Sequence, residues 1–159
     1  MPLLRNGQWV DNNPWVKLND EDDIPTPKEG SDLAAVSLQR FISLSEDNIH
    51  TVSAVWLEST DDVSLLSDYL ELVQLIIIDF PVFTDGRGYT QARQLRTQLG
   101  FSGELRASGD VRADQILFMA RSGIDTFDFS EKQDEELINE ILSRFSSSYQ
   151  PSYALPIAG

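Results

Sequence analysis

The sequence has 159 residues, of which 41% are hydrophobic, so it is long enough for one globular core and too short for two ordinary domains. Its formal net charge of −14 repels nucleic-acid backbones and anionic membrane surfaces, and we expect neither as a partner. It contains no cysteine and a single histidine, His50. This excludes disulfides, thiol nucleophiles, cysteine-ligated metal centres and, within one chain, sites built from several histidines.

No apolar run reaches the length of a membrane span, and the first residues lack the apolar segment of a signal peptide. We therefore expect a cytoplasmic protein. Charge is distributed unevenly: residues 80–125 contain six arginines and five acidic residues, a net charge of +1, whereas the rest of the chain carries −15. Arginine suits contact with carboxylate, phosphate or another oxyanion, although arginines on solvated helix faces commonly pair with neighbouring aspartates.

The first 30 residues are predicted to form an N-terminal arm and a linker. Residues 8–10 and 15–18 flank the turn sequence Asp11-Asn12-Asn13-Pro14, so they are expected to form a small hairpin or an extended arm. Residues 20–31 are acidic and contain proline and glycine, which is typical of a linker. We expect the α/β domain to occupy residues 31–146, and residues 147–159 to form an extended or disordered tail.

Strand-like runs alternate with helical patterns through residues 31–146. The strands are expected at 33–36, 51–57, 75–79, 104–107 and 126–129, and the helices at 38–47, 60–72, 89–99, 110–121 and 130–145. This order predicts an α/β fold, a single domain with a mainly parallel sheet of about five strands joined by right-handed crossovers. The run at 75–79 is continuously apolar, so it should lie in the middle of the sheet. The pattern leaves open whether the sheet is flat and doubly wound or curved as part of a βα-barrel.

The later predicted strands each end in a polar turn. In parallel α/β sheets the turns that follow the strands share one edge, and ligands bind there. No catalytic residue is assigned by this pattern. The candidate ligand-binding residues at the edge are Asp79, Thr84, Asp85, Gly86, Arg87, Gly88, Arg106, Ser108, Asp110 and Arg112.

The sequence Gly86-Arg87-Gly88 stands where a helix is expected to begin. Its backbone N–H groups, the positive helix end and the guanidinium together favour a small oxyanion such as sulfite, sulfate or phosphate. The alternative is structural: the glycines set a tight turn and Arg87 pairs with a neighbouring aspartate. Asp79 ends an apolar strand and its charge needs a partner, for which Arg87 and Arg106 are the candidates. No G-x-G-x-x-G pattern follows a strand, so a Rossmann nicotinamide site has no support.

Two segments carry a recognisable pattern. Residues 79–93 read D-F-P-V-F-T-D-G-R-G-Y-T-Q-A-R, and residues 100–111 read G-F-S-G-E-L-R-A-S-G-D-V, followed by Asp114-Gln115. On these segments the chain resembles a bacterial family of unknown function whose members are described as oxidoreductases involved in sulfite reduction. The resemblance implies a role in assimilatory sulfite or sulfate reduction, with sulfite reductase or another sulfur-assimilation enzyme as the partner.

Three classes of function fit the sequence. The first, which we favour, is a non-enzymatic accessory or binding protein of sulfite reduction that holds a small oxyanion, or docks on the reductase, at the strand edge and has no cofactor. The second is an oxidoreductase, which without cysteine would need a noncovalent organic cofactor such as flavin. The third is a βα-barrel-like lyase or hydrolase that uses a divalent metal. Its carboxylates would be Asp79, Asp85, Asp110 and Asp128.

The oligomeric state is a separate prediction. Exposed sheet edges favour a homodimer.

Overall fold

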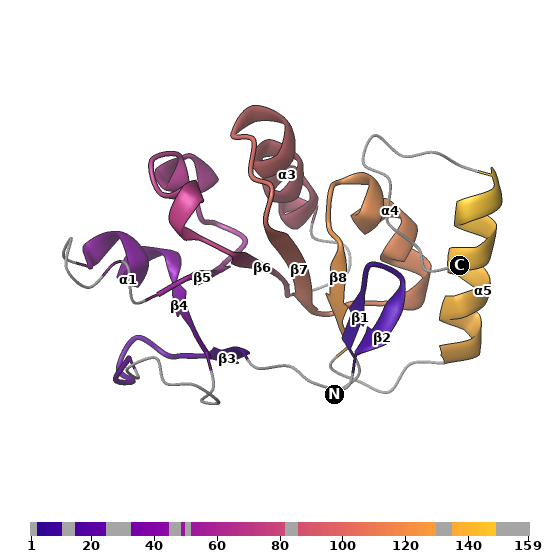
Figure 1. Ribbon diagram of the computed structural model, residues 1–159, viewed down its shortest axis with the longest axis horizontal. Helices are drawn as coiled ribbons and strands as arrows, with labels where there is room; N and C mark the ends of the chain where they lie inside the picture. Colours follow the sequence, from indigo (N-terminus) through magenta and orange to yellow (C-terminus); the bar gives the residue numbers. More distant parts are fainter. Residues whose placement is uncertain are drawn as a thin grey trace.

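The computed structural model describes residues 3–10, 15–24, 33–44, 49, 52–81, 86–129 and 135–148. Within these residues eight strands form one sheet, and helices α1, α3 and α4 lie along one of its faces (Figure 1). The strands are β1 (Leu3–Arg5), β2 (Gln8–Val10), β3 (Trp15–Lys17), β4 (Leu33–Ser37), β5 (Ala54–Leu57), β6 (Leu75–Phe80), β7 (Glu104–Gly109) and β8 (Thr126–Asp128). The helical elements are α1 (Leu38–Ser43), η1 (Val63–Leu66), η2 (Leu70–Leu72), α3 (Arg87–Arg93), η3 (Gln94–Gln98), η4 (Ala113–Gln115), α4 (Ile116–Arg121) and α5 (Glu135–Ser148).

Strands β3 to β8 are parallel and lie side by side in the order in which they occur in the chain. A doubly wound sheet reverses its strand order, and this sheet does not. Because right-handed crossovers that always advance in one direction place their helices on one face, α1, α3 and α4 fall on the same side in Figure 1. The predicted α/β fold with a mainly parallel sheet is confirmed, with six parallel strands among the described residues in place of five.

The two edge strands of the sheet are neighbours in the sequence. β2 is one edge strand and β3 the other, yet only four residues separate Val10 from Trp15. Five Cα–Cα steps of about 3.8 Å span no more than about 19 Å. Seven strand spacings of about 4.8 Å would place the edges of a flat sheet about 34 Å apart. The sheet must therefore curl with its helices outside, and we call the side turned away from the helices the inner face.

The first ten residues belong to the sheet, which corrects the predicted N-terminal arm. β2 pairs antiparallel with β1 and not with β3, and β1 joins the sheet beside β8. The turn between β1 and β2 is Asn6-Gly7, with φ angles of 50° and 80°. Asn-Gly is a strong hairpin signal because both residues accept left-handed backbone conformations. The predicted hairpin across the turn sequence at 11–14 is wrong, since its two flanking strands are at opposite edges of the sheet.

Successive side chains of each strand point to opposite faces of the sheet, so the hydrophobic core consists of two clusters, one on each face. The larger cluster fills the space between the sheet and the helices, where Ile76 and Ile78 of β6 meet residues of α1, α3 and α4. The smaller cluster lies on the inner face and contains Leu75 and Ile77 of the same strand. β6 is therefore buried on both faces, as predicted for a strand in the middle of the sheet.

The crossover between β5 and β6 contains two short 3-10 helices, η1 and η2, in place of the helix predicted at 60–72. Asp62 caps η1 by accepting from the Ser64 backbone N–H at 3.0 Å and from its hydroxyl at 2.7 Å. Leu65, expected in the buried stripe, is 43% exposed. Short polar side chains that bond to nearby backbone compete with a continuous α-helix, and this segment is rich in Ser and Asp.

The helix predicted at 110–121 begins later than expected. η4 starts at Ala113 and runs into α4, with Arg112 at the cap position and no side chain bonding to the helix start. Asp110 therefore does not cap it, and instead accepts a hydrogen bond from Arg112. No helix in the described part of the chain is long and apolar enough to cross a membrane. Several predictions lie outside the described residues, namely those for the turn sequence at 11–14, the linker from residue 25 onward, His50, Thr84, Asp85, the capping pattern at 130–133 and the tail from 149 onward.

Candidate functional site

The carboxyl ends of β6, β7 and β8 place three polar side chains level with one another on the inner face. Asp79 pairs with Ser108 in the register of β6 and β7. Arg106 pairs with Thr126, so Ser108 and Asp128, each two residues further along its strand, also stand level. Because side chains alternate between the faces of a sheet, all three point to the inner face. We call Asp79, Ser108 and Asp128 the edge row.

The turn after β7 is packed tightly against the end of β6. Gly109 has a φ of 88°, and a Cβ added to it would lie 2.5 Å from the Phe80 carbonyl oxygen and 2.7 Å from Asp79 Oδ1. The next residue, Asp110, donates its backbone N–H to the same carbonyl at 2.7 Å. Its carboxylate accepts a hydrogen bond from Arg112 Nε at 3.0 Å. Only glycine fits at position 109, and this tight turn brings Asp110 and Arg112 next to the edge row.

The start of α3 is held by packing. Gly86 is the cap residue, Arg87 is the first helical residue, and Arg87 is exposed. Gly88 is buried on the helix side of the sheet, where an added Cβ would lie 2.6 Å from Phe80 Cε1 and 3.1 Å from Ile78 Cγ2. The close approach of α3 to β6 therefore explains this glycine without a ligand.

Arg106 lies on the inner face one step below the edge row and is only 1% exposed. Its Nη2 is 2.7 Å from Glu104 Oε2, and its Nε donates to the same oxygen at 3.2 Å. The Nε of Arg5, on β1, is 2.8 Å from the other oxygen of Glu104. A buried guanidinium requires an opposite charge nearby, and one carboxylate supplies it to both arginines. We call Arg5, Glu104 and Arg106 the inner charge cluster; it connects β7 to β1 across β8.

Burial raises the pKa of the Asp128 carboxyl above its usual value, and the positive charge of Arg106 opposes this rise. The folded protein therefore holds the Asp128 proton more tightly than the unfolded chain does. The protonated Asp128 carboxyl therefore stabilises the fold at a pH below its pKa in the unfolded chain. This stabilisation is lost as the pH rises through the higher pKa of Asp128 in the folded protein. At neutral pH the ionised carboxylate lowers the stability of the fold.

We accordingly expect Asp128→Asn to be more stable than the parent at pH 7, because the amide keeps the shape of the side chain and removes the buried charge. Urea unfolding at pH 7 and at about pH 4, near the usual pKa of an aspartate, measures the effect. The advantage of the variant should shrink at the lower pH. If the variant is the less stable protein at pH 7, attraction between Asp128 and Arg106 outweighs the effect of burial.

A second arginine with a nearly buried side chain holds the opposite end of the sheet. Arg96 lies in η3, a π-helical turn that extends α3, and its side chain is 9% exposed. Its Nε donates to the Gly123 carbonyl at 2.9 Å, and its Nη1 donates to the carbonyls of Phe101 and Gly103 at 2.8 Å each. Its Nη2 lies 3.2 Å from Asp125 Oδ2. Burial raises the pKa of Asp125, and Arg96 opposes this rise. These contacts join the segments that lead into β7 and β8, so the role of Arg96 is structural.

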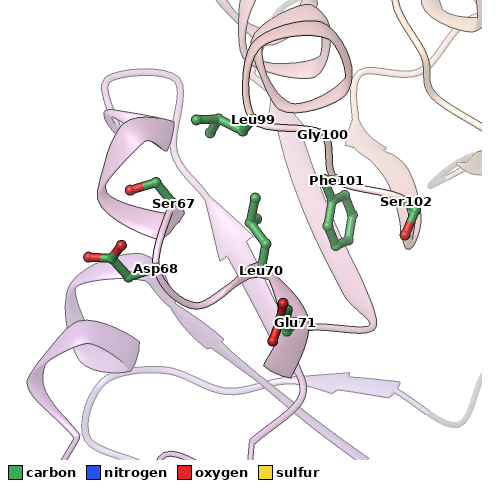
Figure 2. Close-up of a pocket in the computed structure, with 8 residues that line it drawn as sticks. All are labelled: Ser67, Asp68, Leu70, Glu71, Leu99, Gly100, Phe101 and Ser102. Atoms are coloured by element: carbon green, nitrogen blue, oxygen red, sulfur yellow. The ribbon is translucent and has the colours of Figure 1, made fainter.

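A pocket of about 420 Å³ opens between two segments, one joining η1 to η2 and the other joining η3 to β7 (Figure 2). Both segments lead toward the amino ends of strands, so the pocket lies away from the edge row. In Figure 2 the side chain of Leu70 reaches from one segment toward Leu99 on the other. The residues that line the pocket are Ser67, Asp68, Leu70, Glu71, Leu99, Gly100, Phe101 and Ser102.

The predicted candidates fall into three groups. Those at or next to the edge row are Asp79, Arg106, Ser108, Asp110 and Arg112. Those at the start of α3 are Gly86, Arg87 and Gly88, and those outside the described residues are Thr84 and Asp85. The pairing of Asp79 with Arg87 or Arg106 stays a prediction. Among the described residues, no three His, Asp or Glu side chains are grouped so that they could hold a metal ion.

The pairing of Arg106 with Glu104 was not predicted from the sequence. The signal was present in β7, where Glu104, Arg106 and Ser108 alternate with Leu105 and Ala107. Such an alternation places all three polar side chains on one face of the strand. The partner on β1 could not be found in this way, because it depends on which strand lies beyond β8. The pocket carries no signal in the sequence, since its two walls are about thirty residues apart in the chain.

Comparison with known proteins gives a family and no activity. Residues 54–158 match the family described as bacterial protein of unknown function (DUF934). The matched region begins at β5 and includes the edge row, Glu104, Arg106 and the whole pocket. No curated protein matches the chain. The chain therefore belongs to the DUF934 family of bacterial proteins of unknown function, which confirms that part of the resemblance read from the sequence.

Proposed function

We propose that the protein is a non-enzymatic binding protein of sulfite reduction that holds a small oxyanion at the edge row. The observation that carries the proposal is the position of the Ser108 hydroxyl, which stands at a strand end on the inner face, one step above the guanidinium of Arg106. Hydroxyl and guanidinium groups are donors suited to an oxyanion. The link to sulfite comes from the sequence resemblance.

The architecture supports this location. A curled sheet whose strands follow one another in chain order supports our proposal that the fold is part of a βα-barrel. In such folds, and in open parallel sheets, ligands bind where the strands end at their carboxyl side. Arg87 is the first residue of α3, the helix that follows β6, and Arg112 lies three residues after the end of β7. The site therefore has further guanidinium groups close by in the sequence.

The carboxylates narrow the choice of anion. Asp79 and Asp128 flank Ser108, so a doubly charged anion meets repulsion from both sides. Hydrogen sulfite carries one charge less, and its proton can be donated to a carboxylate while its remaining oxygens accept hydrogen bonds. We therefore favour hydrogen sulfite over sulfate as the anion.

Calorimetric titration with sulfite, and with sulfate at the same ionic strength, tests the proposal. We expect saturable binding that is tighter for sulfite. Arg87→Gln should weaken it about tenfold or more, the value of one charge-assisted hydrogen bond, and Ser108→Ala should weaken it about fivefold. The matched control is Arg93→Gln, which removes the same charge from an exposed position at the other end of α3 and should leave binding unchanged.

Two results would argue against this function. If the parent and all three variants respond alike, Arg87 is a structural turn residue and the edge row does not hold the anion. A visible absorption spectrum of the purified protein is the second check. A reproducible flavin band at one per chain would favour the oxidoreductase hypothesis, because flavin is a cofactor that a chain without cysteine can use.

A further inference from the structure

The pocket of Figure 2 combines an apolar wall with a negatively charged rim. Phe101 is buried and Leu70 and Leu99 are half-buried, so they form the apolar part. Asp68 and Glu71 are exposed, and both come from the segment that leads into and through η2. The volume of about 420 Å³ is within the range of sites that enclose a ligand or a large side chain.

The described residues that line this pocket include two acidic side chains; the nearby guanidinium of Arg96 binds the Phe101 carbonyl and pairs with Asp125. None of the described residues that line it is a lysine, arginine or histidine. Among the described residues, no ion pair involves Asp68 or Glu71. The crossover at residues 58–71 contains five acidic residues and no basic one. The wall of the pocket that belongs to this crossover is therefore negatively charged.

Both walls of the pocket are held in place by hydrogen bonds to their backbone groups. The Phe101 N–H donates to the Leu95 carbonyl at 2.8 Å, and the Phe101 carbonyl accepts from Arg96 Nη1 at 2.8 Å. On the other wall the Leu72 N–H donates to the Tyr69 carbonyl at 2.9 Å. A pocket that is already formed costs little conformational entropy when it is filled.

We propose that this pocket is the docking site for a basic segment of a partner protein, which inserts an arginine side chain. The methylene groups of arginine would pack on Leu70 and Leu99, and the guanidinium would bind the carboxylates of Asp68 and Glu71. Guanidinium is more weakly hydrated than ammonium, so it suits a mainly polar pocket that also has apolar side chains in its lining. The acidic crossover extends beyond the pocket and complements a basic surface, which favours a protein over a small cation. The inference is independent of the proposed oxyanion site.

Backbone amide NMR of the intact protein tests the proposal. The probe is the peptide acetyl-Leu-Arg-Leu-amide, and its control contains citrulline, which has the shape of arginine without the charge. We expect saturable shifts confined to the amides of residues 67–71 and 99–102, and binding about tenfold weaker for the citrulline peptide. Shifts spread over all the acidic segments, or equal affinity for the two peptides, would overturn the proposal.

Variants decide whether the two carboxylates form the site. Asp68→Asn together with Glu71→Gln should weaken binding of the arginine peptide at least about fivefold. The control Glu58→Gln removes one charge from an exposed residue of the same crossover that does not line the pocket, and should change affinity little. Ser102→Lys, which places a cation at the rim, should also block the peptide. If Glu58→Gln weakens binding as much as the double variant, the attraction is a general effect of charge and the pocket is not the site.

Discussion

Replacing Arg96 by alanine is expected to lower the free energy of unfolding by about 3–5 kcal/mol, the cost of breaking a buried charge pair by removing one partner. Arg96 donates to three backbone carbonyls and to Asp125, and its side chain is 9% exposed. Without it, these carbonyls lose hydrogen bonds and the Asp125 carboxylate loses a positive charge that opposes its raised pKa. The segments leading into β7 and β8 lose a shared anchor. Urea unfolding, followed by the midpoint and the slope, measures the loss.

The matched control is Arg93→Ala, three residues earlier in the same helical segment. Arg93 is exposed, and substitutions at such positions usually change stability by less than about 0.5 kcal/mol. Arg96→Lys tests the geometry, because an ammonium on a flexible stem cannot reproduce the planar fork of a guanidinium. We expect the lysine variant to recover only a small part of the loss. A loss below about 1 kcal/mol for Arg96→Ala would mean that water replaces the guanidinium at these carbonyls.

Local patterns in the sequence predict the sheet and its middle strand. The apolar run at β6 and the alternation of strands and helices are both recovered in the structure, because each depends on residues close together in the chain. The curl of the sheet depends on something else. Because β1 pairs with β8, the hairpin strand β2 lies at one edge of the sheet and β3 lies at the other. Only four residues join these two edge strands, so the sheet must curl to bring them together. The Asn6-Gly7 sequence is a signal for the hairpin of β1 and β2, but the turn sequence at 11–14 led to the prediction of a different hairpin.

The expectation that arginines lie on solvated helix faces and pair with neighbouring aspartates holds for only some of the arginines. Arg112 pairs with a neighbouring aspartate at the surface, as the sequence analysis allowed. Arg96 and Arg106 are nearly buried, and their partners are drawn from other strands and loops or from a strand face. The shape of η3 explains part of this for Arg96, because a π-helical turn displaces the side chain from the spacing of an α-helix. Such a displacement cannot be read from apolar periodicity.

The part of the candidate site that could be predicted is the set of residues at the carboxyl ends of the strands. Asp79 and Ser108 stand level because β6 and β7 are adjacent and parallel, which the alternation of elements already implied. For Gly88 the sequence allowed either a ligand site or a structural role, and the structure shows it packed against Phe80. The charges beneath the edge row could not be predicted, since Glu104 joins Arg106 of its own strand to Arg5 of a strand nearly a hundred residues away.

Replacing Glu104 by glutamine is expected to lower the free energy of unfolding by about 3 kcal/mol, because it removes the carboxylate that lies 2.7 Å from the buried guanidinium of Arg106. Arg106 is 1% exposed, and both oxygens of Glu104 lie within 2.8 Å of an arginine nitrogen. Arg106→Met should cost less, since Glu104 then keeps its ion pair with Arg5 and an apolar side chain takes the buried position.

The double variant Glu104→Gln with Arg106→Met separates the pair from the effects of each residue alone. If the inner face is enclosed by the curled sheet, the losses of the two single variants should not add, and the interaction free energy should be about 0.5–3 kcal/mol. Urea unfolding of the parent and the three variants completes this cycle. Additive losses, or a loss below about 1 kcal/mol for Glu104→Gln, would mean that water reaches the inner charge cluster and screens it. The cycle therefore measures how far the curl of the sheet shields its inner face, on which the edge row also lies.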